Sequence, residues 1–266
     1  IYVAGEAPPS GTRFRNETLD LSTDDYTITM WVRATGSYSA GGGSDGQVFA
    51  PNNFNVKLSQ GGGIGFNATD GASMTSSNGT AIPVDSEWYH VAIVVDRDGT
   101  DSRIYVNSCD VTDDPLEATP TSLTPGGSEF WTWGRSLNGF GDDFAIFGGQ
   151  ALSQAEIIGL NGVTPVATTL TTSTSSSTTT TTIVTTTTST STLTTSNLVN
   201  HWKFDEASWN GTAGEVVDSS GNGHHGTAID GATTVAGRGG FWGRAASLDG
   251  VDDWLDFGDS LDYDLQ

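Results

Sequence analysis

The sequence predicts an all-β protein, an antiparallel sandwich split into two pieces by a Thr/Ser-rich tract. The chain has 35 glycines and 8 tryptophans, a composition typical of strands joined by tight turns. Many short segments alternate between apolar and polar residues, as expected for strands that bury one face. Between the pieces, residues 166–196 contain 25 Ser or Thr in 31 positions and no charge, so they can bury almost nothing.

The first piece, residues 1–165, contains most of the predicted strands. Residues 26–32 alternate with period two, and residues 88–95 (WYHVAIVV) are the most apolar run, which predicts a central strand. Ser153 and Glu156 form a capping-box pattern, which predicts one helical turn over residues 153–158. Further strands are predicted at residues 47–50, 54–58, 64–66, 103–107, 130–133 and 144–147.

The second piece, residues 197–266, begins with the strand pattern LVNHWKF at residues 198–204. A run of small and polar residues, DSSGNGHHG at 218–226, predicts a tight loop that admits positive φ angles. Further strands are predicted at residues 216–218, 227–229, 246–248 and 254–257.

The formal net charge of −22 excludes several partners. The chain has 32 acidic and 10 basic residues, so its surface repels nucleic acid and anionic membranes. No apolar run reaches 18 residues, so no membrane span is predicted. The acidity itself has three interpretations: a solvated acidic face, several Ca²⁺ sites, or a protein adapted to high salt.

The single cysteine, Cys109, allows no intrachain disulfide and is expected to be a small buried apolar residue. A secreted animal domain would more often carry cysteine pairs, so a prokaryotic surface protein is predicted. The sequence begins at Ile1 and shows no signal peptide, which suggests a removed leader or a fragment. The predicted location is extracellular or at the cell surface.

The chain resembles the laminin-G-like, concanavalin-A-like lectin/glucanase superfamily. The resemblance rests on residues 18–34 (TLDLSTDDYTITMWVRA), EWYHVAIVVD, SRIYVNS, GDDFAIF and ALSQAEI in the first piece, and on LVNHWKFDE, DSSGNGHHG and RAASLDGVDDWLDFG in the second. It implies a jelly-roll sandwich, often with bound Ca²⁺, and often with a carbohydrate or protein ligand.

The order of these segments departs from that of the family. The opening third of a module lies at residues 197–262, and the rest lies before the tract at 20–162. Three arrangements remain open: a window on a tandem array, a permuted chain that closes on itself, or a C-terminal piece that completes the next subunit. The last arrangement gives head-to-tail polymers of copies of the chain, because contacts of that kind do not close. It is the leading prediction.

The tract and four Asn-x-Ser/Thr sequons predict glycosylation. Asn67 and Asn78 lie in polar, Gly-rich segments and are the best acceptors, with Asn16 and Asn210 as the others. The Ser/Thr tract reads as an O-glycosylated stalk or as a bare linker. Within it, the acceptors are predicted to include Thr178, Thr179, Thr180 and Thr181.

A Ca²⁺ site is predicted from carboxylate and amide oxygens in the loops. Asp218 and Asn222 lie in the Gly-rich loop, and oxygen ligands of this kind suit Ca²⁺. The resemblance adds Asp142, which precedes the strand FAIF at a Ca²⁺-linked position of the family. Asp249, Asp252 and Asp253 are a reserve set. The alternative is that these aspartates only cap turns.

Catalysis is not predicted. Glucanases of the superfamily use two glutamates on one strand face, whereas no two of the eight glutamates here lie within five residues of each other. Trp209 and Trp242, flanked by Asn and Gly, are the tryptophans most expected to be exposed for sugar stacking. Two functions remain: a structural subunit of a surface filament or adhesin, and a Ca²⁺-dependent carbohydrate-binding module.

Overall fold

The computed structural model describes residues 25–36, 45–50, 54–59, 63–68, 73–76, 82–97, 102–114, 130–135, 137–161, 198–238 and 242–259. The strands are β1 (Tyr26–Ala34), β2 (Asp45–Ala50), β3 (Phe54–Ser59), β4 (Ile64–Ala68), β5 (Ser73–Ser76), β6 (Tyr89–Val95), β7 (Arg103–Val106), β8 (Cys109–Asp110), β9 (Thr112–Asp114), β10 (Phe130–Trp133), β11 (Asn138–Gly148), β12 (Leu198–Trp202), β13 (Thr227–Ile229), β14 (Thr233–Arg238), β15 (Trp242–Asp249) and β16 (Trp254–Asp259). The helix α1 spans Gln154–Leu160.

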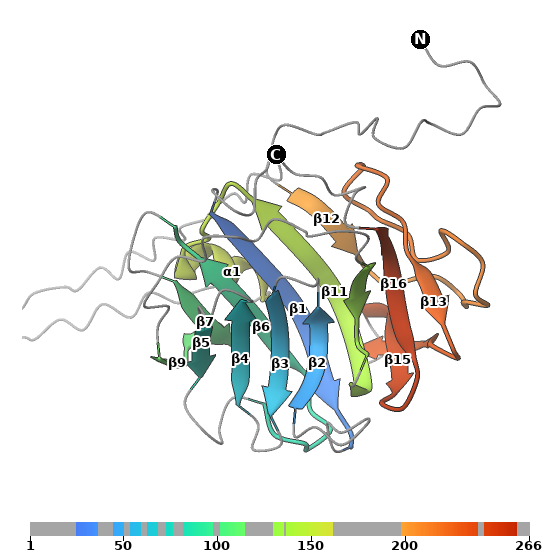
Figure 1. Ribbon diagram of the computed structural model, residues 1–266, viewed down its shortest axis with the longest axis horizontal. Helices are drawn as coiled ribbons and strands as arrows, with labels where there is room; N and C mark the ends of the chain where they lie inside the picture. The colour runs from blue at the N-terminus through green and yellow to red at the C-terminus, as the bar shows by residue number, and fades with distance from the viewer. Residues whose placement is uncertain are drawn as a thin grey trace, which may run out of the picture.

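The described strands form two antiparallel sheets packed face to face, which confirms the predicted all-β sandwich of jelly-roll type (Figure 1). The first sheet has the order β14-β15-β11-β1-β6-β7-β8, and β12 also pairs with β11. The second sheet has the order β13-β16-β10-β2-β3-β4-β5-β9. Neighbouring strands are often distant in sequence, so non-local pairing defines the fold.

The main core lies between the sheets and follows the period of the strands. In β1, the alternating side chains of Tyr26, Ile28, Met30 and Val32 are at most 1% exposed. They meet inward-facing residues of the second sheet, such as Phe49, in one hydrophobic cluster. Burial of each such side chain contributes roughly 1.5–3 kcal/mol. The opposite face of the first sheet, here called the outer face, carries the other residues of β1.

Strands from both sides of the Ser/Thr tract complete one sandwich within a single chain. β11 pairs with β12 through Phe144–Trp202 and with β15 through Gly141–Ala246, and β10 pairs with β16. In Figure 1 the orange β12 and the red β15 and β16 belong to the second piece, and they pair with β11 and β10 of the first. The arrangement is the self-closed one, whereas the leading prediction placed the C-terminal strands on a neighbouring copy. The tract itself lies outside the described residues.

A second, smaller cluster covers part of the outer face. Ser153 caps α1, and its capping box with Glu156 is present as predicted. Ile157 of α1 is fully buried and belongs to the same hydrophobic cluster as Ala145 and Phe147 of β11. The helix thus covers one part of the outer face. No helix among the described residues is long and apolar enough to cross a membrane.

Two expectations about single residues are wrong, and one cannot be compared with the described residues. Cys109 is exposed, because it lies on the short edge strand β8. Trp209 is only 7% exposed: its ring packs edge-on against Phe204. The side chain of Trp242 lies outside the described residues. β5, β8, β9 and β14 were not predicted, and residues 216–218 form isolated bridges instead of a strand.

Candidate functional site

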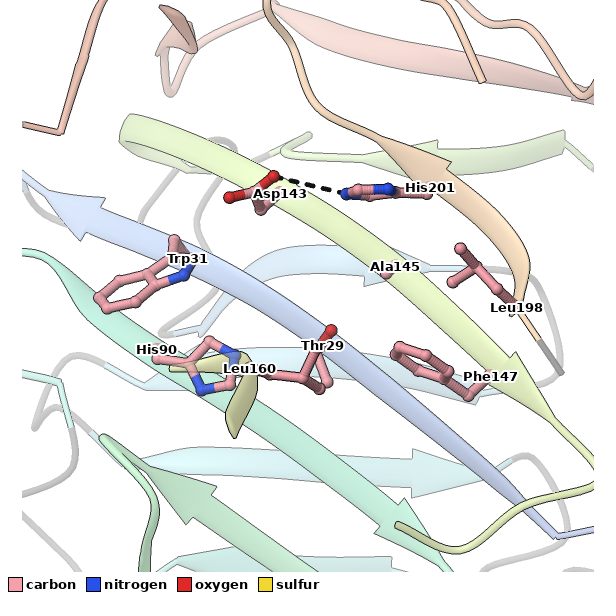
Figure 2. A pocket seen from close by; sticks show the side chains of 9 residues that line it. All are labelled: Thr29, Trp31, His90, Asp143, Ala145, Phe147, Leu160, Leu198 and His201. Carbon is pink, nitrogen blue, oxygen red and sulfur yellow. Dashed lines mark hydrogen bonds and ion pairs between the residues drawn. The ribbon is translucent and has the colours of Figure 1, made fainter. Parts of the chain in front are cut away.

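A pocket of about 250 Å³ opens on the outer face of the first sheet (Figure 2). Side chains from β1, β6, β11 and β12 line it, and α1 adds one residue at its side. The lining residues are Thr29, Trp31, His90, Asp143, Ala145, Phe147, Leu160, Leu198 and His201.

The hollow arises from a row of small side chains across the sheet. Ala145 pairs with Thr29 on one side and with His201 on the other, and Thr29 pairs with Ala92. Larger side chains stand on both flanks of this row, with Phe147 on one of them. Because side chains on one sheet face are spaced by two residues along a strand, a row of small residues leaves a groove between bulky rows.

A β-bulge in β11 places two consecutive aspartates on the outer face. In the pairing of β1 with β11, Thr29 opposes Ala145 but Trp31 opposes Asp142, so β11 has one extra residue at this point. Asp143 has φ = 48°, a left-handed conformation that is uncommon outside glycine. A regular strand would send neighbouring residues to opposite faces, so the bulge is what brings both carboxylates together.

Arg238, at the end of β14, binds both aspartates. Its Nε donates to Asp142 Oδ2 at 3.0 Å, and its Nη2 donates to Asp143 Oδ2 at 2.8 Å. The guanidinium also stacks on Trp31, with its central carbon 3.9 Å from the ring centroid. Trp31 in turn contacts His90, with the ring centroids 5.2 Å apart. The guanidinium is therefore held on two sides, by carboxylates and by an aromatic face.

Asp143 and His201 form the polar edge of the pocket. The His201 Nε2 lies 3.4 Å from Asp143 Oδ1, and Figure 2 shows the two side chains facing each other from β11 and β12. The side chains are 40% and 23% exposed, so both are accessible from the pocket. The 3.4 Å separation is long for a hydrogen bond, which leaves Asp143 Oδ1 able to accept another donor.

The two neighbouring aspartates have opposite pKa shifts. Burial, together with the charge of Asp143, raises the pKa of Asp142 to about 7 despite Arg238. Burial also acts to raise the pKa of Asp143, but the hydrogen bond from His201 and the charges of Arg238, His201 and Lys203 outweigh it and lower that pKa. Asp143 is thus ionised at neutral pH, whereas Asp142 is only partly ionised there.

His90 is a neutral, buried wall of the pocket. It is 2% exposed, and burial followed by the charge of Arg238 lowers its pKa to about 4. Its Nδ1 is buried and has no hydrogen-bond partner among the residues that the structure describes. An unpaired buried nitrogen of this kind costs about 1–3 kcal/mol of folding stability. A group that costs stability and lines a pocket is a good candidate for a functional contact.

The residues predicted to bind Ca²⁺ are already engaged with protein groups. The Asp218 carboxylate accepts hydrogen bonds from the backbone N–H groups of His201, Ser220, Gly223 and His224, and from the Ser220 hydroxyl. The Asn222 Nδ2 donates to the carbonyls of Leu198 and Val199.

Asp142 is likewise paired, with Arg238, and its side chain is only 4% exposed. A cation at either place would have to displace these donors or the guanidinium, so the three residues do not fit a shared Ca²⁺ site. Asp218 instead acts as the centre of the 218–226 loop and ties it to His201, near the end of β12.

The reserve set does come together. Asp249, Asp252 and Asp253 lie in the turn between β15 and β16, with carboxylate oxygens within 4.8 Å of one another. The Asp249 Oδ1 accepts the N–H of Val251 at 2.8 Å, and the Asp253 Oδ2 accepts the N–H of Asp249 at 3.0 Å. These hydrogen bonds account for the cluster as a turn-capping device.

The predicted glycosylation sites remain predictions. Asn210 is exposed in a turn, where its Oδ1 accepts hydrogen bonds from the backbone N–H and the hydroxyl of Thr212. Asn67 lies within β4 and is half-buried. Asn16, Asn78, Thr178, Thr179, Thr180 and Thr181 lie outside the described residues.

The sequence did not predict His201, Arg238, Trp31 and His90 as site residues. Each looks unremarkable in its own strand pattern, and Arg238 lies on a strand that was not predicted. The available signal was the Asp142–Asp143 pair before an apolar run, because two adjacent acids in a strand require a cation nearby. Which cation they would find depended on the pairing of distant strands.

Comparison with known proteins identifies the fold family. The sequence profile of the concanavalin A-like lectin/glucanases superfamily (Laminin_G_3) matches residues 10–158. No curated protein sequence gives a significant match. Similar solved structures include a Bacteroides ovatus protein described as carbohydrate-binding, with 12% identity and a TM-score of 0.49. The alignment covers 80% of this chain and about half of that one, 52%.

Two further structures have lower scores. The CBM40 module of the Ruminococcus gnavus IT-sialidase, bound to α2,3 sialyllactose, has 17% identity and a TM-score of 0.41, with 57% of this chain and 96% of that chain covered. The binding domain of the Paraclostridial Mosquitocidal Protein 1 has 17% identity and a TM-score of 0.39, with 53% and 37% covered. Because the profile match spans more than half of the sequence, the chain belongs to the concanavalin A-like lectin/glucanase superfamily.

Proposed function

We propose that the chain is a lectin-like module that binds carbohydrate through the outer-face pocket without transforming it. The observation that carries the proposal is the pocket itself: an apolar floor with two accessible polar side chains, Asp143 and His201, at one edge. At about 250 Å³ the pocket lies below the roughly 300–1,000 Å³ typical of drug-sized ligands, so it suits one small ring.

The lining offers the two kinds of contact that a sugar ring makes, apolar contacts and hydrogen bonds. Phe147, Leu198 and Leu160 offer apolar contacts for the C–H groups of a ring. Asp143 can accept hydrogen bonds from hydroxyl groups, and the His201 ring can donate or accept one. This combination of apolar surface and few convergent polar groups is typical of small-molecule sites.

The arrangement does not favour hydrolysis. A glycosidase needs an acid and a second carboxylate on either side of the scissile bond. Asp142 has the raised pKa of an acid, but its carboxylate is paired with Arg238 and it is not among the residues that line the pocket. Among the described residues that line the pocket, Asp143 is the sole carboxylate.

We further propose an extracellular location, which suits a glycan ligand and the predicted glycosylation. Filament formation has less support from the structure than it had from the sequence motifs. The edges that a neighbouring copy was expected to complete are occupied by β12, β15 and β16 of the same chain. With those edges occupied, strand complementation at β10 and β11 loses its driving force.

A pocket-filling variant tests the proposal. Leu198→Trp adds an indole to the pocket without altering its polar groups, whereas Val251→Trp adds the same group at a residue that is 70% exposed and is not part of the pocket. Both variants and the parent chain would be titrated with mono- and oligosaccharides by calorimetry. We expect Leu198→Trp to weaken binding at least tenfold and Val251→Trp to leave it unchanged.

Two results contradict the proposal. If the folded parent chain binds none of the sugars at millimolar concentration, the assigned function is wrong. If Leu198→Trp binds as well as the parent chain does, the site is not this pocket.

A further inference from the structure

We propose that the pocket selects uncharged sugar rings and rejects acidic ones, with Asp143 as the acceptor for a ring hydroxyl. The inference rests on the proposed function and adds the class of ligand. It follows from how the charges around the pocket are distributed among β11, β12 and β14.

Asp143 presents a carboxylate that is only partly satisfied. Its Oδ2 accepts from Arg238 at 2.8 Å, while its Oδ1 has the longer 3.4 Å contact with His201. The side chain is 40% exposed, so a ligand can reach it. A ligand hydroxyl could donate to Oδ1 in a charge-assisted hydrogen bond, whereas a ligand carboxylate would meet a like charge at the same place.

Arg238, the cation that could have attracted an acidic ligand, is already paired with two carboxylates of the protein. Arg238 binds Asp142 and Asp143 with two of its nitrogens, and its flat face lies on Trp31, so its side chain is only 15% exposed. An arginine held in this way has few donors left for a second carboxylate. Lys203 lies two residues after His201 and is exposed; its charge helps to lower the pKa of Asp143, but its side chain is not part of the pocket lining.

His90 supplies an independent observation that points to an uncharged ligand. The side chain lines the pocket and is 2% exposed, and its Nδ1 has no partner among the described residues. Burial keeps the imidazole uncharged at neutral pH, so this wall does not attract an anion. A neutral imidazole can pair with a hydroxyl in either direction, through the choice of tautomer.

The test compares matched sugars that differ by one carboxylate. The parent chain would be titrated with methyl glucoside and methyl glucuronide, and with methyl galactoside and methyl galacturonide. We expect the neutral member of a bound pair to bind at least tenfold more tightly. In Asp143→Asn the ratio should fall below about threefold, because the repelling charge is gone; Asn tolerates the left-handed backbone of this position.

Asp110→Asn is the control for loss of a paired aspartate. Asp110 forms an ion pair with Arg103 at 3.4 Å, outside the pocket, so this change should leave the ratio as it is. Equal or tighter binding of the acidic sugars by the parent chain would overturn the inference while leaving the proposed function intact. If no sugar of any kind binds, the proposed function fails first.

A second variant tests the role of His90 separately. His90→Phe keeps a flat ring beside Trp31 and removes the unpaired nitrogen. We expect this variant to unfold at the same or a higher denaturant concentration, yet to bind the neutral sugars at least fivefold more weakly. Unchanged sugar binding by a stable His90→Phe protein would show that His90 does not contact the ligand and would remove that support from the inference.

Discussion

At the scale of single residues, the outer-face site contains two ionisable groups whose pKa values differ strongly from their ordinary values. His90 is a buried imidazole whose pKa is lowered to about 4, and Asp142 is a buried carboxyl whose pKa is raised to about 7. The charge of Arg238 acts on both groups: it opposes protonation of His90 and favours ionisation of Asp142. The two shifts act on stability in opposite directions as the pH changes.

Consider the two contributions between about pH 4 and pH 6.5. The unfolded state protonates His90 first as the pH falls, so stability from this residue is complete above pH 6.5 and falls by about 3 kcal/mol toward pH 4. For Asp142 the folded state keeps its proton while the unfolded state ionises. The contribution of Asp142 to the free energy of unfolding is therefore complete below about pH 4 and falls by about 4 kcal/mol as the pH rises to 7.

The prediction is a weak net pH dependence of the parent chain in this range, with the opposing slopes revealed by substitution. In His90→Phe, the free energy of unfolding should fall steadily from pH 4 to pH 7. In Asp142→Asn, it should instead rise from pH 4 to pH 6.5. Denaturant titrations at half-unit pH steps measure both slopes. Parallel curves for the two variants and the parent chain would show that neither group titrates as described.

The sequence identified only part of this site. The resemblance predicted Asp142 as a Ca²⁺ ligand, whereas in the structure its carboxylate forms an ion pair with Arg238. The period-two reading of β11 places adjacent aspartates on opposite faces, and only the bulge opposite Met30 overrides it. A bulge depends on the register with the neighbouring strand, which a single strand pattern does not contain.

At the scale of elements, β11 holds the two pieces together. It pairs with β1 along one side, and with β15 and then β12 along the other. The sequence predicted its apolar half at residues 144–147 but not the Gly-rich half, because glycine weakens a strand pattern. The structure explains Gly141: the six-membered ring of Trp133 lies against its Cα, where any Cβ would overlap it.

Gly141→Ala should therefore destabilise the protein by roughly 3 kcal/mol, the upper end of the usual cost of overpacking, because Trp133 is fully buried and has little room to move. Gly149→Ala is the comparison. An added Cβ at Gly149 meets nothing within 4 Å, so its cost is limited to the positive φ of 65°, about 1 kcal/mol. Chemical denaturation of both variants measures the difference. Equal losses would mean that the Trp133 ring yields easily.

At the scale of the whole molecule, the sequence motifs reveal the unusual order of the segments but not what that order means for assembly. The split of one module into residues 1–165 and 197–266 could be read from the motifs, but the motifs cannot tell whether the missing strands come from the same chain. In the structure, the pairs Phe144–Trp202, Gly141–Ala246 and Thr132–Asp256 lie within one chain. Phe257 and Trp202, both from the second piece, stack within the shared core.

Cutting the chain between the pieces tests this closure. A site-specific protease sequence placed within residues 166–196 would allow cleavage of the folded protein, and a scrambled sequence of equal length would serve as the uncut control. Because β12, β15 and β16 pair with β11 and β10 of the same chain, we expect the cut pieces to stay together with the mass of one chain in native mass spectrometry. They should separate only in denaturant, since separation exposes both sheet edges and half of the core. Species that grow with protein concentration would show instead that copies exchange these strands, and a soluble, stable first piece after cleavage would show that it does not need them.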